Sequence, residues 1–202
     1  MRSAAVVLAA GKSERMGRNK LLLKMAGRSI LDWLLDALNS SEIDEVLIVL
    51  GHRPQDIRPI AEAYNAKVVI NTEYEEGMTS SFKAGLRHVY SDAAFLILGD
   101  QLGLKAELLN RMTATMESDQ EALLVSPVHR GRRGHPVLFR RTLFHEVLSL
   151  APGETVREVV MRHEASHRVV EGDVWCILDI DTPEDFEEAR RLFEASRGAG
   201  HR

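Results

Sequence analysis

The chain has 202 residues, of which 45% are apolar and 28% are charged, and this composition is typical of a globular protein with a sizeable core. Its formal net charge of −4 argues against a nucleic-acid-binding protein, for which a strongly basic surface is expected. No apolar stretch approaches the roughly 20 residues that cross a bilayer, and a single cysteine, Cys176, excludes an internal disulfide. We therefore expect a cytoplasmic protein that binds neither nucleic acid nor membranes.

Short β-branched runs alternate with amphipathic segments along most of the sequence. These runs predict strands at 4–8, 46–50, 67–70, 94–98, 123–125, 137–139 and 176–181. The amphipathic segments predict helices that begin after Ser29, at 55–64 with a disruption at Pro59, at 80–90, at 105–116, after Thr155 and after Thr182. Continuous apolar strands are typical of a parallel sheet that helices cover on both faces. We expect one α/β domain over residues 1–196 and a frayed tail at 197–202.

The loop after the first strand concentrates positive charge around small residues. A turn of small residues is followed by Lys12, Arg15, Arg18 and Lys20. Small residues let the backbone approach a ligand closely, and successive amide groups in such a turn form a concavity for anions. Arg15 can form paired hydrogen bonds with phosphate oxygens, whereas Lys20 acts as a point charge. The loop suits a nucleoside triphosphate, and the alternative is a plain turn with solvated basic residues.

Two common phosphate-binding motifs are absent from this loop. No Lys-Ser or Lys-Thr pair follows Gly17, as the Walker A loop requires, and no glycine stands two positions after Gly11, as the dinucleotide fingerprint requires. Residues 8–22 read Leu-Ala-Ala-Gly-x-Ser-x-Arg-Met-Gly-x-x-Lys-Leu-Leu. This pattern closely resembles the signature loop of nucleotidyltransferases of the molybdenum cofactor type.

Segments along the rest of the chain carry the same resemblance. They are Glu76–Ser81, Gly99–Gln101, Gly134–Phe139 and Asp179–Asp185. The chain is most similar to the molybdenum cofactor cytidylyltransferases, because its loop reads Leu-Ala-Ala-Gly where guanylyltransferase relatives tend to have Leu-Ala-Gly-Gly. The resemblance implies a three-layer, Rossmann-like nucleotidyltransferase fold with a mostly parallel central sheet flanked by helices.

The resemblance also implies a reaction and its partners. CMP would be transferred from CTP to the phosphate of molybdopterin or the molybdenum cofactor, with release of pyrophosphate, and a molybdoenzyme would receive the product. Two alternatives remain open: a transferase that acts on a sugar or polyol phosphate, and a carrier or maturation chaperone of the molybdenum cofactor without catalysis of its own. Pyrophosphate release distinguishes the enzymes from the carrier.

Family motifs assign the expected catalytic and nucleotide-binding residues. Arg15, Lys20 and Asp100 are the expected catalytic residues. The expected nucleotide-binding residues are Leu8, Ala9, Ala10, Gly11, Lys12, Ser13, Arg15, Lys20, Gly77, Ser80 and Ser81. For the two serines, capping of the following helix is an equally good interpretation.

Acidic residues at predicted strand ends suggest a metal site. Asp100 follows the strand at 94–98, where open α/β sheets place their ligands, although Leu102 stands where the family usually has proline. Asp179 and Asp181 would share one side of a strand that continued through them. Carboxylates from distant strands suit Mg²⁺. We expect Asp100, Asp181 and Asp179 to hold Mg²⁺, with helix N-terminal electrostatics as the alternative for the last two.

A basic loop at 129–135 is the candidate acceptor site. Its arginines belong either to a mobile solvated loop or to a lid that meets an anionic acceptor. The resemblance implies that the acceptor-binding residues are Gly134, His135, Pro136 and Arg133. His163 and His167 have helical spacing, but no third ligand is evident nearby, so we do not expect a zinc site.

Overall fold

A computed structural model describes residues 1–199 of the chain, with side chains through residue 196. Within this range the longer helices are α1 (Ile30–Asn39), α2 (Pro54–Ala63), α3 (Met78–Leu86), α4 (Ala106–Ser118), α5 (Phe144–Leu148), α6 (Val156–Arg162) and α7 (Pro183–Ala199). Short 3₁₀ turns are η1 (Glu14–Met16), η2 (Lys20–Leu22), η3 (Tyr74–Glu76), η4 (Arg141–Leu143), η5 (Glu164–Ser166) and η6 (Val174–Cys176). No described helix is long and apolar enough to cross a membrane.

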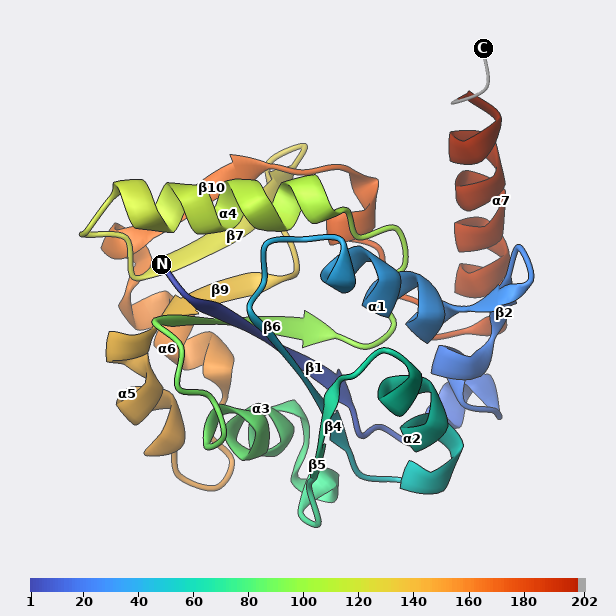
Figure 1. Cartoon of the computed structure of the whole chain (residues 1–202), viewed down its shortest axis with the longest axis horizontal. Helices are drawn as coiled ribbons and strands as arrows, with labels where there is room; N and C mark the ends of the chain where they lie inside the picture. Colours follow the sequence, from blue (N-terminus) through green and yellow to red (C-terminus); the bar gives the residue numbers. More distant parts are fainter. Residues whose placement is uncertain (200–202) are drawn as a thin grey trace.

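A twisted, mostly parallel sheet forms the centre of the molecule (Figure 1). Its strands are β1 (Ser3–Ala9), β4 (Glu45–Leu50), β5 (Lys67–Ile70), β6 (Ala93–Leu98), β7 (Leu124–His129), β8 (Arg132–Arg133), β9 (Val137–Arg140) and β10 (His167–Glu171). Their order is β10-β7-β9-β6-β1-β4-β5, with β8 paired to β7, and β2 (Lys24–Met25) and β3 (Arg28–Ser29) form a separate hairpin. In the described part of the chain, β9 is the strand of this path that runs antiparallel to its neighbours, and β8 is antiparallel to β7.

Helices cover both faces of the sheet. Successive side chains of β1 point to opposite faces, so each set packs against a different group of helices. Ala5 and Val7 pack with α1, α2 and α4 on one face, whereas Ala4 and Val6 pack with α3, α5 and α6 on the other. These four residues of β1 are fully buried, as the continuous apolar run predicts. The predicted α/β class and three-layer, Rossmann-like arrangement are confirmed.

A third apolar cluster attaches α7 to the edge of the molecule. Phe186, Ala189 and Phe193 of α7 are buried with Met16, Met25 and residues of the preceding segment, Trp175 and Ile180. Figure 1 shows α7 standing beside the sheet rather than on one of its faces. This cluster fixes the segment between η6 and α7 near the loop that follows β1.

Several predicted boundaries are corrected by the structure. The helix predicted at 80–90 spans Met78–Leu86, and α2 continues through Pro59 without a break. Residues 177–181 form no strand, because the turn η6 precedes them and Ile180 is buried against α7 instead of pairing with the sheet. The tail predicted to fray, residues 197–202, stays a prediction: α7 is described as far as Ala199, and residues 200–202 lie outside the described residues.

The predicted N-caps of α1 and α6 are confirmed. The Ser29 hydroxyl accepts a hydrogen bond from the Asp32 amide at 3.0 Å, and the Asp32 carboxylate accepts one from the Ser29 amide at 3.0 Å. Thr155 and Glu158 form the same reciprocal pair at the start of α6. Each pair satisfies backbone donors that the first helical turn leaves free.

Candidate functional site

A cleft of about 550 Å³ opens at the carboxyl ends of β1 and β6. Open α/β sheets bind ligands at this edge. The lining residues are Leu8, Ala9, Ala10, Gly11, Ser13, Lys20, Leu21, Tyr74, Gly77, Met78, Ser81, Leu98, Asp100, His135, Asp179 and Asp181. Motifs from both ends of the chain therefore meet in one cavity.

Lys20 is the charged centre of this cleft. Its Nζ forms an ion pair with Oδ2 of Asp100 and lies 3.1 Å from Oδ1 of Asp181. Burial alone would lower the pKa of Lys20, but the two carboxylates outweigh burial and raise it above its ordinary value. The side chain is 21% exposed, so its charge faces the cleft with little solvent around it. Such a cation can exchange a carboxylate for a phosphate oxygen.

Arg15 reaches the same carboxylate from the outer side. Its Nη2 lies 2.7 Å from Oδ2 of Asp181, and its side chain is 69% exposed. Desolvation tends to raise the pKa of Asp181, yet Lys20 and Arg15 together lower it. Asp181 is therefore ionised at neutral pH and holds both cations at the cleft.

The loop after β1 contains a residue in the left-handed backbone region, and hydrogen bonds within the loop fix its shape. Ser13 has φ 54° in the left-handed region, and its hydroxyl accepts a hydrogen bond from the Lys20 amide at 3.2 Å. Asn19 caps η2 by accepting from the Leu21 amide at 3.1 Å. These local bonds place Lys20 at the start of η2, pointing into the cleft.

A second cavity of about 440 Å³ continues the cleft outward from Lys20. Lys12 and Arg15 line it, and it shares Gly11, Ser13 and Lys20 with the cleft. Lys12 Nζ lies 2.5 Å from Oε1 of Glu75, and the ion pair raises the pKa of Lys12. Glu75 and its neighbour Tyr74 were not predicted as site residues, because no motif marks them.

The segment at Gly77–Ser81 forms the opposite wall of the cleft. The serines are not N-caps of α3: Gly77 occupies that position, and no side chain caps the helix. Instead, the buried Asn71 amide donates to the hydroxyls of Ser80 at 2.9 Å and Ser81 at 3.1 Å. Ser81 and Gly77 line the cleft, whereas Ser80 faces another cavity. Asn71 is thus a positioning residue that sequence reasoning missed.

His135 closes the cleft from the β9 side. Burial lowers the pKa of His135, against the opposing charges of Asp179 and Asp100. Its amide donates to the Cys176 carbonyl at 2.8 Å, and its carbonyl accepts from the Gln101 side chain. A Cβ on Gly134 would lie 1.8 Å from the same Cys176 carbonyl oxygen, so only glycine fits there. Gly134 and Pro136 flank His135 in the chain but do not line the cleft themselves.

The basic segment at 129–135 is a β-hairpin rather than a free loop. β8 pairs with β7, and Arg130 and Gly131 at the tip both have positive φ, as a tight two-residue turn requires. Arg133 forms a bidentate ion pair with Glu164, each N–O distance being 2.7 Å, and does not line the cleft. The guanidinium group of Arg133 is therefore held away from the nucleotide side.

The two histidines with helical spacing have separate partners. His163 Nε2 lies 2.6 Å from Glu146, and His167 Nε2 lies 2.7 Å from the buried Ser126 hydroxyl. His163 ends α6 and His167 begins β10, so they share no helix face.

The carboxylates of the cleft provide hard oxygen donors. Asp100 and Asp181 converge on one point, the Lys20 ammonium, and Asp179 lines the same cavity. Among residues 1–199 no group of three or more His, Cys, Asp or Glu side chains is arranged to hold a metal. Mg²⁺ commonly takes one or two carboxylates and completes its shell with water and substrate phosphates. The donor set fits a divalent cation that arrives with a nucleotide.

Comparison with known proteins identifies the family of this chain. Residues 5–169 match the family model of the MobA-like NTP transferase domain. The chain is 27% identical over 190 residues to the molybdenum cofactor cytidylyltransferase of Escherichia coli, covering 93% of this chain and 95% of that protein. It is 32% identical over 198 residues to the purine catabolism protein PucB of Bacillus subtilis, covering 92% and 95%.

A solved structure supports the likeness in three dimensions. A crystal structure of a Mycobacterium tuberculosis protein in complex with manganese superimposes with a TM-score of 0.77 at 26% identity, covering 93% of this chain and 97% of that chain. The match agrees with the central sheet and its flanking helices.

Proposed function

The chain belongs to the MobA-like NTP transferase family, and from this membership we propose that it transfers CMP from CTP to the phosphate of molybdopterin or its molybdenum-loaded form. The observation that carries the proposal is the convergence of Lys20, Asp100 and Asp181 in the cleft beside β1 and β6. The choice of cytidylyl transfer rests on Ala10 in the Leu-Ala-Ala-Gly segment and on the similarity to the E. coli cytidylyltransferase. The location we propose for this reaction is the cytoplasm.

The residues around the cleft divide into three groups by role. Lys20, Arg15, Lys12 and the backbone from Leu8 to Ser13 bind the triphosphate. Gly77 and Ser81 face the nucleotide from the α3 side, and Ser80 supports them through Asn71. His135, which Gly134 and Pro136 flank in the chain, meets the acceptor, while Arg133, which pairs with Glu164, belongs to the acceptor side outside the cleft.

The reaction is a displacement at phosphorus. An oxygen of the acceptor phosphate attacks the α-phosphorus of CTP, a new P–O bond forms, and the bond to the β-phosphate oxygen breaks to release pyrophosphate. A phosphate monoester is already nucleophilic, so alignment and charge neutralisation supply the catalysis. Lys20 neutralises charge on the triphosphate after it exchanges its carboxylate partners for phosphate oxygens.

Asp100 and Asp181, with Asp179 beside them, are the residues that would hold Mg²⁺. When bound, the ion would neutralise negative charge on the phosphates. The same carboxylates keep Lys20 extended toward the cleft before the nucleotide arrives.

An assay of pyrophosphate release tests the proposal. The full chain is incubated with Mg²⁺, one α-labelled triphosphate at a time, and molybdopterin, glucose 1-phosphate or erythritol 4-phosphate. We expect pyrophosphate release and label transfer only with CTP and molybdopterin. Faster turnover of GTP would overturn the choice of nucleotide, and turnover of a sugar or polyol phosphate would overturn the acceptor. Tight binding of molybdopterin without any pyrophosphate would instead indicate a carrier.

A further inference from the structure

One buried side chain anchors the exposed part of the loop after β1. Residues 14, 15, 17 and 18 are exposed, and the Arg15 side chain is 69% exposed, whereas Met16 is 8% exposed. Met16 belongs to the third apolar cluster, which includes Phe186 and Ala189 of α7. Its side chain therefore ties this segment to the body of the protein at the position next to Arg15.

The same cluster reaches the two segments that carry the cleft carboxylates. Ile180, which is 1% exposed, precedes Asp181, and Leu102, which is 2% exposed, follows Asp100 by two residues. The Asp181 amide is held as well, because it donates to the Asp185 carboxylate in the first turn of α7 at 3.1 Å. Both cleft carboxylates therefore stand within two residues of a buried member of the cluster.

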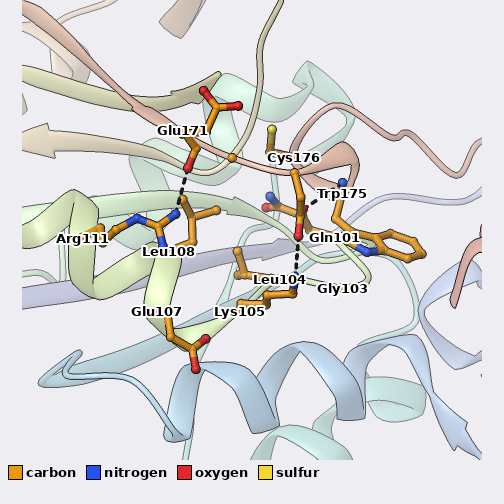
Figure 2. A pocket seen from close by; sticks show the side chains of 12 residues that line it. Gln101, Gly103, Leu104, Lys105, Glu107, Leu108, Arg111, Glu171, Trp175 and Cys176 are labelled. Atoms are coloured by element: carbon orange, nitrogen blue, oxygen red, sulfur yellow. Dashed lines mark hydrogen bonds and ion pairs between the residues drawn. The ribbon is translucent and has the colours of Figure 1, made fainter. Parts of the chain in front are cut away.

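Trp175 joins the loop after β6 to this cluster. Its indole ring lies beside Gly103 (Figure 2), where an added Cβ would lie 2.3 Å from the ring atom Cδ2. Trp175 is 6% exposed, and its ring centroid lies 6.2 Å from that of Phe193 in α7. Gly103 directly follows Leu102, so the ring packs against both the loop after β6 and α7.

A buried anchor fixes the loop more firmly than the Arg15–Asp181 ion pair does. Arg15 is mostly exposed, and an exposed ion pair holds two side chains in one geometry only weakly. A side chain in a close-packed interior has one preferred position, so Met16 restricts where its neighbour in sequence lies. Met16 also borders the second cavity beside Lys12, but its side chain offers a phosphate neither charge nor a hydrogen-bond donor.

We propose that Met16 is a positioning residue for nucleotide binding. Through the third apolar cluster it fixes Arg15 relative to the two cleft carboxylates, so that the guanidinium group is in place before the triphosphate arrives. The proposal rests on the proposed function, in which Arg15 binds the triphosphate. It assigns to α7 a part in nucleotide binding, because this helix covers the cluster on which the three charged segments meet.

A double-mutant cycle tests whether Met16 acts through Arg15. Calorimetry measures the Kd of the full chain for CTP with Mg²⁺, without an acceptor. Arg15→Met should weaken binding about tenfold, through loss of one charge-assisted contact. Met16→Ala should weaken it about fivefold, because the freed Arg15 must be ordered on binding. The double variant should bind within about twofold of Arg15→Met alone.

Matched variants separate positioning from general stability. Met25→Ala removes another buried methionine of the same cluster, which is 1% exposed. It should lower the unfolding midpoint as Met16→Ala does, yet leave the Kd for CTP within about twofold of the wild type. Met16→Leu should restore wild-type binding. Trypsin should cleave after Arg15 at least about fivefold faster in Met16→Ala than in Met25→Ala. Should Met16→Ala not fold, Met16→Val enters the same cycle, with an expected loss of about threefold.

Each result supports or overturns the proposal. Unchanged CTP binding in Met16→Ala, an equal loss with and without Arg15, or an equal loss in Met25→Ala would overturn it. Unchanged binding in Arg15→Met would refute the assigned role of Arg15 and this proposal with it. A wild-type chain that follows the expected cycle but transfers no CMP would refute only the proposed reaction, so the two failures are distinguishable.

Discussion

Lys20 and Asp181 are 161 residues apart in the sequence, yet their charged groups lie 3.1 Å apart across the cleft. The 3₁₀ turn after β1 provides the cation, and the segment before α7 provides the carboxylate. This ion pair therefore joins the loop after β1 to the segment before α7. Replacing either residue removes the pair, and the effect on activity can be measured.

Replacement of Lys20 by methionine should abolish most of the activity. Methionine keeps most of the length of the side chain but removes the positive charge that would meet the triphosphate. Loss of one such electrostatic contact typically costs about 10²–10³ in rate. We expect kcat/KM for CTP to fall by at least about 100-fold. Lys24→Met is the matched control, because Lys24 is exposed in the β2–β3 hairpin. Normal turnover by Lys20→Met would refute the assignment.

Replacement of Glu75 by glutamine should tighten nucleotide binding. Glu75 pairs with Lys12 at 2.5 Å at the outer cavity, and this pair competes with any phosphate for the Lys12 ammonium. Both groups are well exposed, so we expect only a few-fold decrease in KM for CTP, with kcat unchanged and an effect that fades as salt is raised. Glu73→Gln is the control. An increased KM would show that Glu75 assists the nucleotide.

Two glycine substitutions should separate folding from binding. In Gly134→Ala the added Cβ would collide with the Cys176 carbonyl oxygen at 1.8 Å, so we expect a loss of about 3 kcal/mol or more in the free energy of unfolding. In Gly11→Ala nothing lies within 4 Å of the added Cβ, so stability should be retained. Gly11 lines the cleft, and its new methyl group should raise KM for CTP. Urea unfolding and steady-state kinetics of both variants check this contrast.

Stability should decline in acid because of buried histidines. Burial lowers the pKa of His167 from 6.5 to about 4, and the pKa of His135 is lowered as well. Between these pH values the unfolded chain binds more protons than the folded one, so the free energy of unfolding falls as pH decreases from 6.5 to about 4. His167 alone should account for about 3 kcal/mol.

The variant His167→Gln isolates this contribution. Glutamine can still form a hydrogen bond with the Ser126 hydroxyl but does not titrate. Urea unfolding at several pH values should therefore give a shallower decline for the variant than for the wild type. Equal slopes would show that His167 does not contribute.

Much of the sheet could be predicted because its signals are local. The apolar runs of β1, β4 and β6 are buried on both faces, and a short, continuous, β-branched apolar run predicts such a strand. The segment at 176–181 gave a false strand because Cys176-Ile177-Leu178 has the same local character. Leu178 and Ile180 pack instead into the apolar cluster with Phe186 and Phe193, a tertiary contact that no local pattern encodes.

The site was predictable where a motif names it and not where only proximity does. Lys20, Asp100 and Asp181 stand in recognisable segments, and the structure brings them together. Asn71 and Glu75 have no motif, and their importance depends on contacts with Ser80 and Lys12. The hairpin at Arg130-Gly131 was missed because the usual sequence signal for its turn is Asn-Gly or Asp-Gly.

Asp179 and Asp181, which line the cleft, are synthesised long after the loop that follows β1. The family match ends at residue 169. A nascent chain that has just been synthesised through this region therefore still lacks Asp179 and Asp181. Until Ile180 and α7 settle against the rest of the protein, Lys20 has only Asp100 beside it. A nascent polypeptide therefore carries the loop after β1 long before it carries every residue that lines the cleft.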